Sequence, residues 1–385
     1  MENFICSIRD VGPLMAIAHF LNNIKNYRVF VLVTEPAATA VACNEVFINE
    51  DVQVLCYYRG EWISLKEYKK SYISNENACA FTTEFAKGYL ELKESIYKLF
   101  QLLKPKKLLR TTPAYKWGVD EAVLCVAQEL GVLNECYCYQ ETYMCGVELE
   151  RMQNPIAVVD SVAYNYLTGK GISAIEVGWL SLGKLNDSQP YVEARVQARK
   201  KLGIDFCETA ILYCVTASTD FSAELMHYNE FLNSIGGISF FIKFHPRTLD
   251  NQKKLYLQLA KGRCKPVDSL SYDEVLAFSD FLISSASMIN FDCVMYQLLR
   301  GDRTFHTIPV YTVGPITAII KRMPTYNNEE LILPMNGNLV IKENDYRDLK
   351  FVNQKNARQL FLNAQHHYSI DIEANINKMF RYMKI

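Results

Sequence analysis

The chain has 385 residues, half of them hydrophobic and 22% charged, and its formal net charge is −1. This composition is typical of a soluble globular protein and excludes a disordered chain, and the length allows two domains that each bury a core. Because no excess of basic residues is available to neutralise a phosphate backbone, nucleic acid is not expected as a partner.

The first half of the chain alternates apolar runs with helical patterns. We expect strands at residues 3–8, 27–34, 51–58, 107–111, 134–142, 155–160 and 175–179. Gly12 and Pro13 predict the start of a helix after the first strand, because proline suits the first helical position. Further helices are expected at residues 75–103 and 121–130. Strands that alternate with helices predict a parallel sheet built from strand-helix-strand units.

A second series of strands and helices follows the polar, turn-rich residues 181–190, which we interpret as a linker between domains. Its expected strands are at residues 209–215, 238–244, 281–283 and 304–313, and its helices at residues 192–202, 221–235, 251–261 and 271–278. Ser271 and Glu274 have the spacing of a capping box at the start of the last of these helices. The second series therefore predicts a second α/β domain.

The closing residues carry apolar side chains at helical spacing: Ile372, Ile376, Met379, Phe380 and Met383. This pattern predicts a final helix with one apolar face. Two interpretations stay open, because such a face can pack back onto the first domain or lie on a membrane surface.

Polar side chains follow three strands of the second series. They are His245, Pro246 and Arg247 after one strand, Ser284, Ser285 and Ser287 after another, and Thr216 and Ser218 after the first strand. Ligands of open α/β sheets bind at the carboxyl ends of strands, and the start of a helix offers N–H groups to a phosphate. We therefore predict that these strand ends form one anion site.

Each motif also has a simpler interpretation. Serines before a helix often only cap its N–H groups. His245 suits a turn, because the residue before a proline avoids the helical region. Thr216 and Ser218 fit a turn as well as a contact to a base or phosphate. The two motifs occur in succession at two strand ends, and this combination favours a shared site.

With its His-Pro motif at His245 and its Ser-Ser motif at Ser284, the chain resembles the nucleotide-binding domain of certain GT-B transferases. These include the bacterial sialyltransferases and polysialyltransferases, the capsule Kdo transferases and, more distantly, the CDP-glycerol glycerophosphotransferases. The motif resemblance covers roughly residues 195–315. The sequence departs from the longer patterns of these families at Ala286, Ser287 and Met288, which leaves the class of donor open.

The resemblance implies a GT-B fold, in which two Rossmann-like α/β domains face a cleft and the last helix crosses back to the first domain. We expect an acceptor-side domain at residues 1–182, a nucleotide-sugar domain at residues 190–365 and the returning helix at residues 366–385. The resemblance also implies that His245 contacts the donor phosphate and acts as an acid towards the leaving nucleotide. Ser284 and Ser285 would hold the same phosphate.

Sugar transfer also needs a base for the acceptor hydroxyl, and the resemblance places an acidic residue in the first domain. Four carboxylates follow strands there: Asp10, Glu35, Asp120 and Glu141. We rank Glu141 and Asp10 first, because each follows an apolar strand. An isolated carboxylate at such a place is also often a helix cap or an ion-pair partner.

We expect no metal, because no convincing D-x-D loop is present and a protein phosphate clamp makes a divalent ion unnecessary. The expected partners are a nucleotide-sugar donor, most simply a CMP-activated acidic sugar such as sialic acid, and a glycan acceptor. The alternatives are a CDP-alditol phosphotransferase, a UDP-sugar enzyme, and a non-catalytic protein that binds sugar nucleotides.

The expected location is the cytoplasm, with peripheral contact to the inner face of a membrane as an option. Arg9 and Asp10 interrupt the first apolar run, so we expect no signal peptide. The sequence contains no run of eighteen apolar residues, so we expect no segment that spans a membrane. The twelve cysteines stand mostly alone in apolar runs, which indicates reduced thiols.

Overall fold

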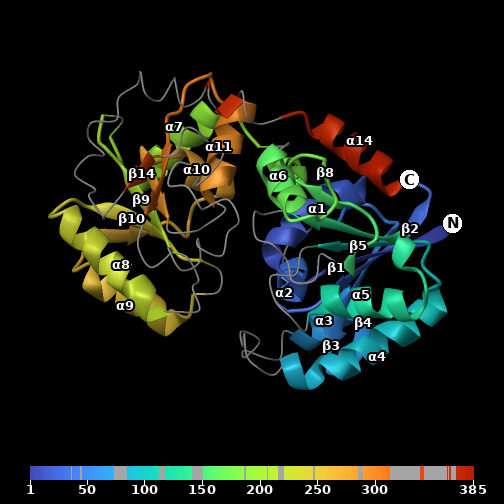
Figure 1. The fold of residues 1–385 in the computed structure, drawn as a ribbon. Coiled ribbons are helices and arrows are strands. Elements are labelled where there is room, and N and C mark those ends of the chain that lie inside the picture. Colours follow the sequence, from blue (N-terminus) through green and yellow to red (C-terminus); the bar gives the residue numbers. More distant parts are fainter. Residues whose placement is uncertain are drawn as a thin grey trace. The chain divides into compact units, whose positions relative to one another are not determined.

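The computed structural model describes two compact units. The described residues are 1–35, 37–43, 46–72, 85–111, 118–140, 151–185, 188–205, 207–215, 221–245, 248–284, 289–312, 339–341, 362, 364–365 and 370–385. The first unit comprises Met1–Lys184 together with Asp371–Ile385, and the second comprises Leu185–Ile370. Each unit is an α/β, Rossmann-like domain around a mainly parallel sheet, as the sequence predicts (Figure 1).

The sheet of the first unit has eight described strands. They are β1 (Glu2–Ile8), β2 (Tyr27–Val33), β3 (Val52–Tyr58), β4 (Glu61–Ser64), β5 (Lys107–Thr111), β6 (Cys136–Gln140), β7 (Ile156–Val158) and β8 (Ala174–Glu176). Their order is β4-β3-β2-β1-β5-β6-β7-β8, and only the β3–β4 pair is antiparallel. The chain proceeds outward in both directions from β1, so the switch point of this sheet lies between β1 and β5.

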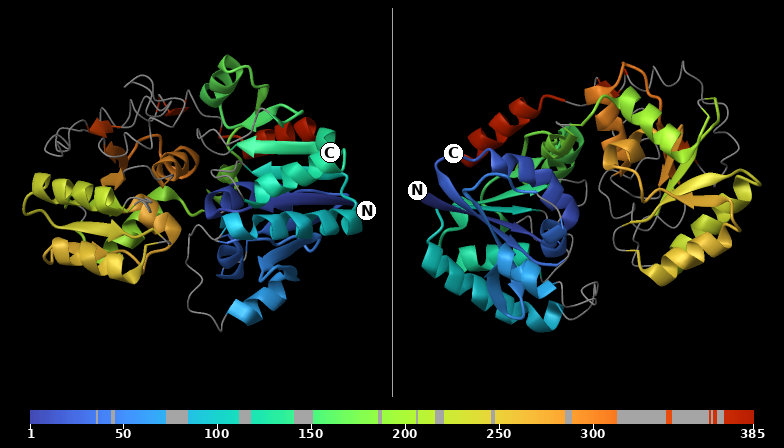
Figure 2. Two further views of the ribbon diagram at one scale, coloured as in Figure 1. Left: turned by 60° about the horizontal axis from the view of Figure 1, so that its bottom comes forward. Right: turned by 180° about the vertical axis from the view of Figure 1, so that it is seen from behind.

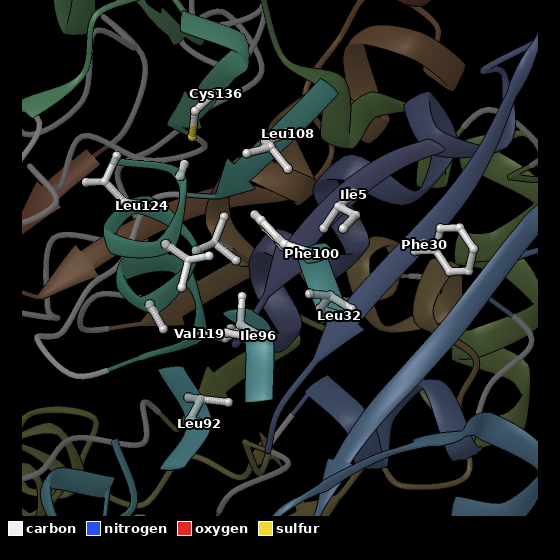
Figure 3. Close-up of a cluster of buried hydrophobic side chains, with 14 of the residues drawn as sticks. Ile5, Phe30, Leu32, Leu92, Ile96, Phe100, Leu108, Val119, Leu124 and Cys136 are labelled. Carbon is white, nitrogen blue, oxygen red and sulfur yellow. The ribbon is translucent and has the colours of Figure 1, made fainter. Parts of the chain in front are cut away.

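Helices cover both faces of this sheet. The described helices of the first unit are α1 (Val11–Asn22), α2 (Ala37–Cys43), α3 (Leu65–Tyr72), α4 (Phe85–Leu103), α5 (Val119–Glu129), α6 (Ser161–Gly169) and α14 (Ile372–Met383). Two short 3-10 helices, Leu133–Glu135 and Leu180–Leu185, precede β6 and the second unit. Figure 3 shows α4 and α5 packing on Ile5, Leu108 and Cys136 of the sheet.

The C-terminal helix α14 packs on the first unit. Phe380 contacts Phe20 of α1 with ring centroids 5.1 Å apart, and Tyr382 meets the ring of Tyr137 edge-on at 5.1 Å. The Tyr382 hydroxyl also donates to the carbonyl oxygen of Pro155. The apolar face of α14 is therefore buried in the protein, and of the two predicted interpretations the structure shows the helix that packs back.

A glycine makes room for α14. Gly178 has φ of +97°, and a Cβ built on it would lie 2.3 Å from Asn375 Oδ1. We expect Gly178→Ala to lower the free energy of unfolding by about 2 kcal/mol or more, because it adds backbone strain and a collision. Chemical denaturation of the purified variant measures this loss.

Gly171→Ala is the matched control. Gly171 lies in the same unit with φ of +78°, but no atom lies within 4 Å of its added Cβ. This variant has only the backbone penalty, about 1 kcal/mol. Equal losses for the two variants would show that the contact with Asn375 does not matter.

The sheet of the second unit has six described strands. They are β9 (Ile211–Cys214), β10 (Phe240–Lys243), β11 (Cys264–Pro266), β12 (Phe281–Ser284), β13 (Ile308–Thr312) and β14 (Leu339–Ile341). All neighbours are parallel, in the order β11-β10-β9-β12-β13-β14. Numbered within the unit, this is the 3-2-1-4-5-6 order of a dinucleotide-binding sheet, and its switch point lies between β9 and β12.

Five described helices connect these strands or lead into them. They are α7 (Tyr191–Leu202), α8 (Phe221–Ser234), α9 (Asp250–Leu259), α10 (Tyr272–Ala277) and α11 (Ile289–Arg300). Figures 1 and 2 show α8 beside α9, while α7, α10 and α11 form a second group. The Ser271 side chain accepts from Glu274 N, and the Glu274 carboxylate accepts from Ser271 N, so the predicted capping box is present.

The structure differs from the sequence prediction at several short elements. Strands β4 and β11, which have four and three residues at the edges of their sheets, are not predicted from the sequence, and neither are the short helices α2 and α3. The polar stretch predicted as a linker begins inside a 3-10 helix, whose Leu180, Leu182 and Leu185 are buried. Of the helix predicted at residues 75–103, only Phe85–Leu103 lies within the described residues.

Candidate functional site

The candidate site of the second unit lies at the carboxyl ends of its central strands. Strand β9 lies between β10 and β12, and Cys214 is in register with both Lys243 and Ser284. The three strands therefore end at the same level. Their carboxyl ends therefore lie at one edge of the sheet, close to the switch point where open α/β sheets bind ligands.

His245 stands two residues beyond β10, and it is half-buried. Its carbonyl oxygen accepts a hydrogen bond from Thr248 N at 2.8 Å. This backbone hydrogen bond holds His245 next to the end of β10. The turn and the ligand contact both stay predictions, because Pro246 and Arg247 lie outside the described residues.

Ser284 is the last residue of β12 and is fully buried. Its Oγ donates to Asn290 Oδ1 at 2.7 Å, which ties the strand end to the first turn of α11. The hydroxyl hydrogen of Ser284 is therefore used inside the protein. The Ser-Ser motif positions the start of α11 through this residue, and a phosphate contact at the motif has to come from another residue.

Two further side chains lie near this edge and are not among the site residues predicted from the sequence. Asp292, in the first turn of α11, is buried and accepts a hydrogen bond from the hydroxyl of Tyr272 in α10. A carboxylate one turn into the helix after the Ser-Ser motif was the available signal. Asn290, the acceptor for Ser284, could not be recognised because its role depends on that contact.

Several predicted site residues lie outside the described residues. They are Glu141 among the candidate bases, and Thr216, Ser218, Pro246, Arg247, Ser285 and Ser287 among the candidate donor contacts. Their roles stay predictions. Of the predicted donor-side residues, the structure brings His245 and Ser284 to the same edge, on either side of β9.

In the first unit, carboxylates gather at the switch point between β1 and β5. Asp10 begins α1 in an extended conformation, is half-buried, and makes no side-chain capping hydrogen bond. Asp120, in the first turn of α5, is only 1% exposed. Its Oδ1 accepts from Ser7 Oγ at 2.6 Å and from Thr111 N at 3.2 Å, so it joins the ends of β1 and β5.

Burial raises the pKa of Asp120 to about 6, and the nearby charge of Asp10 acts in the same direction. The hydrogen bond from Ser7, the charge of Arg110 and the hydrogen bond from Thr111 N oppose this rise in the pKa. A carboxylate with such a raised pKa beside a second carboxylate is typical of acid-base sites.

Glu35 has a structural role. Its carboxylate accepts hydrogen bonds from Thr39 of α2 and from the hydroxyl of Tyr68 in α3. These bonds tie two helices to the end of β2. Of the four carboxylates considered as bases, the structure brings Asp10 and Asp120 together and uses Glu35 as a link between helices.

Among the described residues, no group of three or more His, Cys, Asp and Glu side chains could hold a metal ion. Within the same part of the chain, no helix is both long and apolar enough to cross a membrane. The metal-free reaction stays a prediction.

No protein-family model matches the chain, and no curated protein matches it in sequence. Solved structures do match. UDP-GlcNAc 2-epimerase from Neisseria meningitidis, bound to UDP-GlcNAc, is 11% identical with a TM-score of 0.58 over 99% of each chain. MurG from Acinetobacter baumannii is 11% identical with a TM-score of 0.54 over 100% of each chain.

The catalytic domain of starch synthase IV from Arabidopsis thaliana, bound to ADP and acarbose, is 9% identical with a TM-score of 0.56, over 100% of this chain and 99% of that chain. These likenesses extend over both units and agree with the strand orders described above. At such identities they show the fold and not the reaction. The chain has the GT-B fold that its two motifs predict.

Proposed function

We propose that this protein is a glycosyltransferase that moves a sugar from a nucleotide donor to a hydroxyl group of a glycan acceptor. The observation that supports it best is the common edge of β10, β9 and β12, where His245 and the start of α11 flank the switch point. GT-B neighbours solved with UDP-GlcNAc, UDP or ADP support a nucleotide as the ligand.

On the donor side, the reaction has to stabilise the departing phosphate. His245 would donate a hydrogen bond or a proton to the phosphate oxygen as the bond to the sugar breaks. The N–H groups at the start of α11, which Ser284 and Asn290 hold against β12, would bind the same charge. Thr216, Ser218, Arg247, Ser285 and Ser287 remain proposed donor contacts.

On the acceptor side, a base has to take the proton of the attacking hydroxyl. We assign this role to Asp10, because it follows β1 at the switch point and is half-buried, so that a substrate can reach it. Asp120 is too deeply buried for direct contact. Glu141 is the remaining candidate.

For the donor, we propose a CMP-activated acidic sugar such as sialic acid, on the strength of the paired His-Pro and Ser-Ser motifs. A UDP-sugar enzyme is the second candidate, because the solved neighbours include proteins with UDP-GlcNAc or UDP bound. That candidate includes epimerisation as well as transfer. A CDP-alditol phosphotransferase and a non-catalytic sugar-nucleotide sensor are the remaining alternatives.

Thermal denaturation with added nucleotides tests the donor class. We expect CMP and CDP to raise the melting temperature more than UDP, ADP or NAD, because a ligand that binds only the folded chain stabilises it. At one hundred times its Kd, a nucleotide contributes about 2.7 kcal/mol. Equal shifts from UDP and CMP would favour the UDP-sugar candidate.

Turnover of the bound sugar nucleotide then separates the remaining alternatives. Product formation that requires an acceptor indicates transfer, conversion of the sugar without an acceptor indicates epimerisation, and binding without turnover indicates a sensor. The same assay in EDTA tests the proposed metal-free mechanism. A large loss of rate that magnesium or manganese restores would show that a metal takes part.

A further inference from the structure

Arg110 of β5 is a fully buried cation that has almost no polar partners among the described residues. There its Nη1 donates only to Met152 Sδ, at 3.7 Å, and its Nε and Nη2 have no hydrogen-bond partner. The buried arginines of the second unit differ. Arg195 and Arg199 both bind the carboxylate of Asp280 and several carbonyl oxygens. A buried guanidinium without such partners lowers the stability of the fold, so a packing role alone does not explain Arg110.

The position of Arg110 relates it to Asp120. Arg110 is in register with Ser7 of β1, and the Ser7 hydroxyl donates to Asp120 Oδ1. In a parallel sheet, residues in register point to the same face. Arg110, Ser7 and Asp120 thus gather on one face of the sheet at its switch point, where the positive charge of Arg110 favours the ionised form of Asp120.

The same geometry relates Asp120 to Asp10. A Cβ at Gly118 would lie 3.4 Å from Arg9 Cδ, so the start of α5 lies against the residues that join β1 to α1. Asp120 stands two residues after Gly118, and Asp10 stands directly after Arg9. The charges of Asp10 and Asp120 act on each other across this contact.

We infer that Asp120, with Arg110 as its counter-charge, is a positioning residue for Asp10: a buried anion that makes Asp10 a stronger acceptor for the proton of the substrate hydroxyl. This inference rests on the proposed function. In the reaction, the acceptor oxygen forms the bond to the sugar carbon and its proton passes to Asp10. The bond from that carbon to the phosphate oxygen breaks, and its electron pair leaves with the nucleotide.

Among the described residues, few other groups can set the charge of Asp120. The titratable groups that interact with it are Asp10 from the β1–α1 junction, Cys6 from β1, Arg110 from β5 and Cys136 from β6, and Arg9 lies against Gly118 at the start of the same helix. Burial raises the pKa of both thiols, so they are neutral at ordinary pH. Arg110 is therefore the cation whose removal should change the ionisation of Asp120 most.

The test is the pH profile of kcat/KM for transfer in the full-length protein and its variants. We expect wild-type activity to fall on the acid side as Asp120 takes up a proton near pH 6. Arg110→Met should move this acid limb to higher pH, with a loss of about tenfold at pH 6 that is largely recovered at pH 8. Arg110→Lys keeps a cation and should keep the limb near its wild-type position.

Asp120→Asn should lower kcat by about tenfold or more and remove the acid limb, while the affinity for the nucleotide stays unchanged. An unmoved limb in Arg110→Met, or a wild-type profile in Asp120→Asn, would overturn the inference. Arg110→Met should fold, because an apolar chain of similar length replaces a buried charge. A uniform loss at every pH together with a lower melting temperature would also overturn it, since that pattern marks a structural role.

Results that contradict the proposed function can be distinguished from results that contradict only this inference. If the wild-type protein neither binds nor turns over any sugar nucleotide, the proposed reaction is wrong and the inference is wrong with it. If Asp10→Asn turns over at the wild-type rate, the assignment of Asp10 as the base is wrong. If Asp10→Asn is inactive while both Asp120→Asn and Arg110→Met keep wild-type profiles, only the inference is wrong.

Discussion

His245→Ala is expected to lower kcat of the transfer by on the order of 10²-fold, with a smaller effect on KM. The reason is that the leaving phosphate develops its charge late, so a preorganised donor at the end of β10 matters mainly in the transition state. Steady-state kinetics and the melting temperature, measured on the same purified variant, check this expectation.

His306→Ala is the matched control for this substitution. His306 belongs to the same unit but lies at the amino end of β13, where its Nε2 pairs with Asp302 at 2.9 Å. Parallel strands place that end away from the proposed site, so kcat should stay at the wild-type value. Ser285→Ala should lower kcat less than His245→Ala does, because N–H groups at the start of α11 still bind the phosphate.

The competing explanation treats His245 as a turn residue only. The hydrogen bond from Thr248 N to the His245 carbonyl uses the backbone, which alanine also has, so this bond can persist in the variant. If the side chain merely supports the turn, His245→Ala lowers the melting temperature and leaves the turnover of the folded fraction near normal. A folded variant with wild-type kcat would contradict the catalytic role.

The sequence predicts the central strands well because the signal for a buried strand lies in a few consecutive residues. Residues 29–33 are a run of apolar side chains, which is typical of a buried parallel strand, and β2 (Tyr27–Val33) contains all of them. Strand β11 could not be found in this way. It has three residues at the edge of its sheet, including Pro266, and such edge strands need few apolar contacts.

The candidate site could be predicted only in part, because its important contacts join distant residues. The His-Pro and Ser-Ser motifs are visible in the sequence, and their positions at strand ends follow from the predicted strands. The contact from Ser7 to Asp120 spans 113 positions in the chain. No local pattern shows that Asp120 is buried near Arg110, and for this reason Glu141 and Asp10 rank above Asp120 in the prediction from the sequence.

Asp120→Asn is expected to stabilise the protein above pH 6. Burial raises the pKa of Asp120 from the ordinary value of 3.8 to about 6, so the folded chain favours the protonated form. This contribution to stability is fully present below pH 3.8 and is lost as the pH rises through about 6. The loss in the wild-type protein amounts to on the order of 3 kcal/mol by pH 8.

Asparagine has nearly the same shape as protonated aspartic acid, and its Oδ1 can still accept from Ser7 Oγ and Thr111 N. Denaturant unfolding of wild type and Asp120→Asn at pH 4 to 8 should therefore give similar stabilities at the acid end and a growing advantage for the variant above it. Asp250→Asn removes an exposed carboxylate beside Lys253 and should show no such growing advantage.

A protein that keeps an ionisable carboxylate where an amide would be more stable retains it for a reason other than folding. Stabilising substitutions that reduce activity are characteristic of functional sites. Asp120→Asn should thus become more stable and less active at pH 8 in the same preparation. If the variant is instead less stable than wild type at pH 8, the carboxylate is a structural link between β1, β5 and α5, and its burial does not oppose folding.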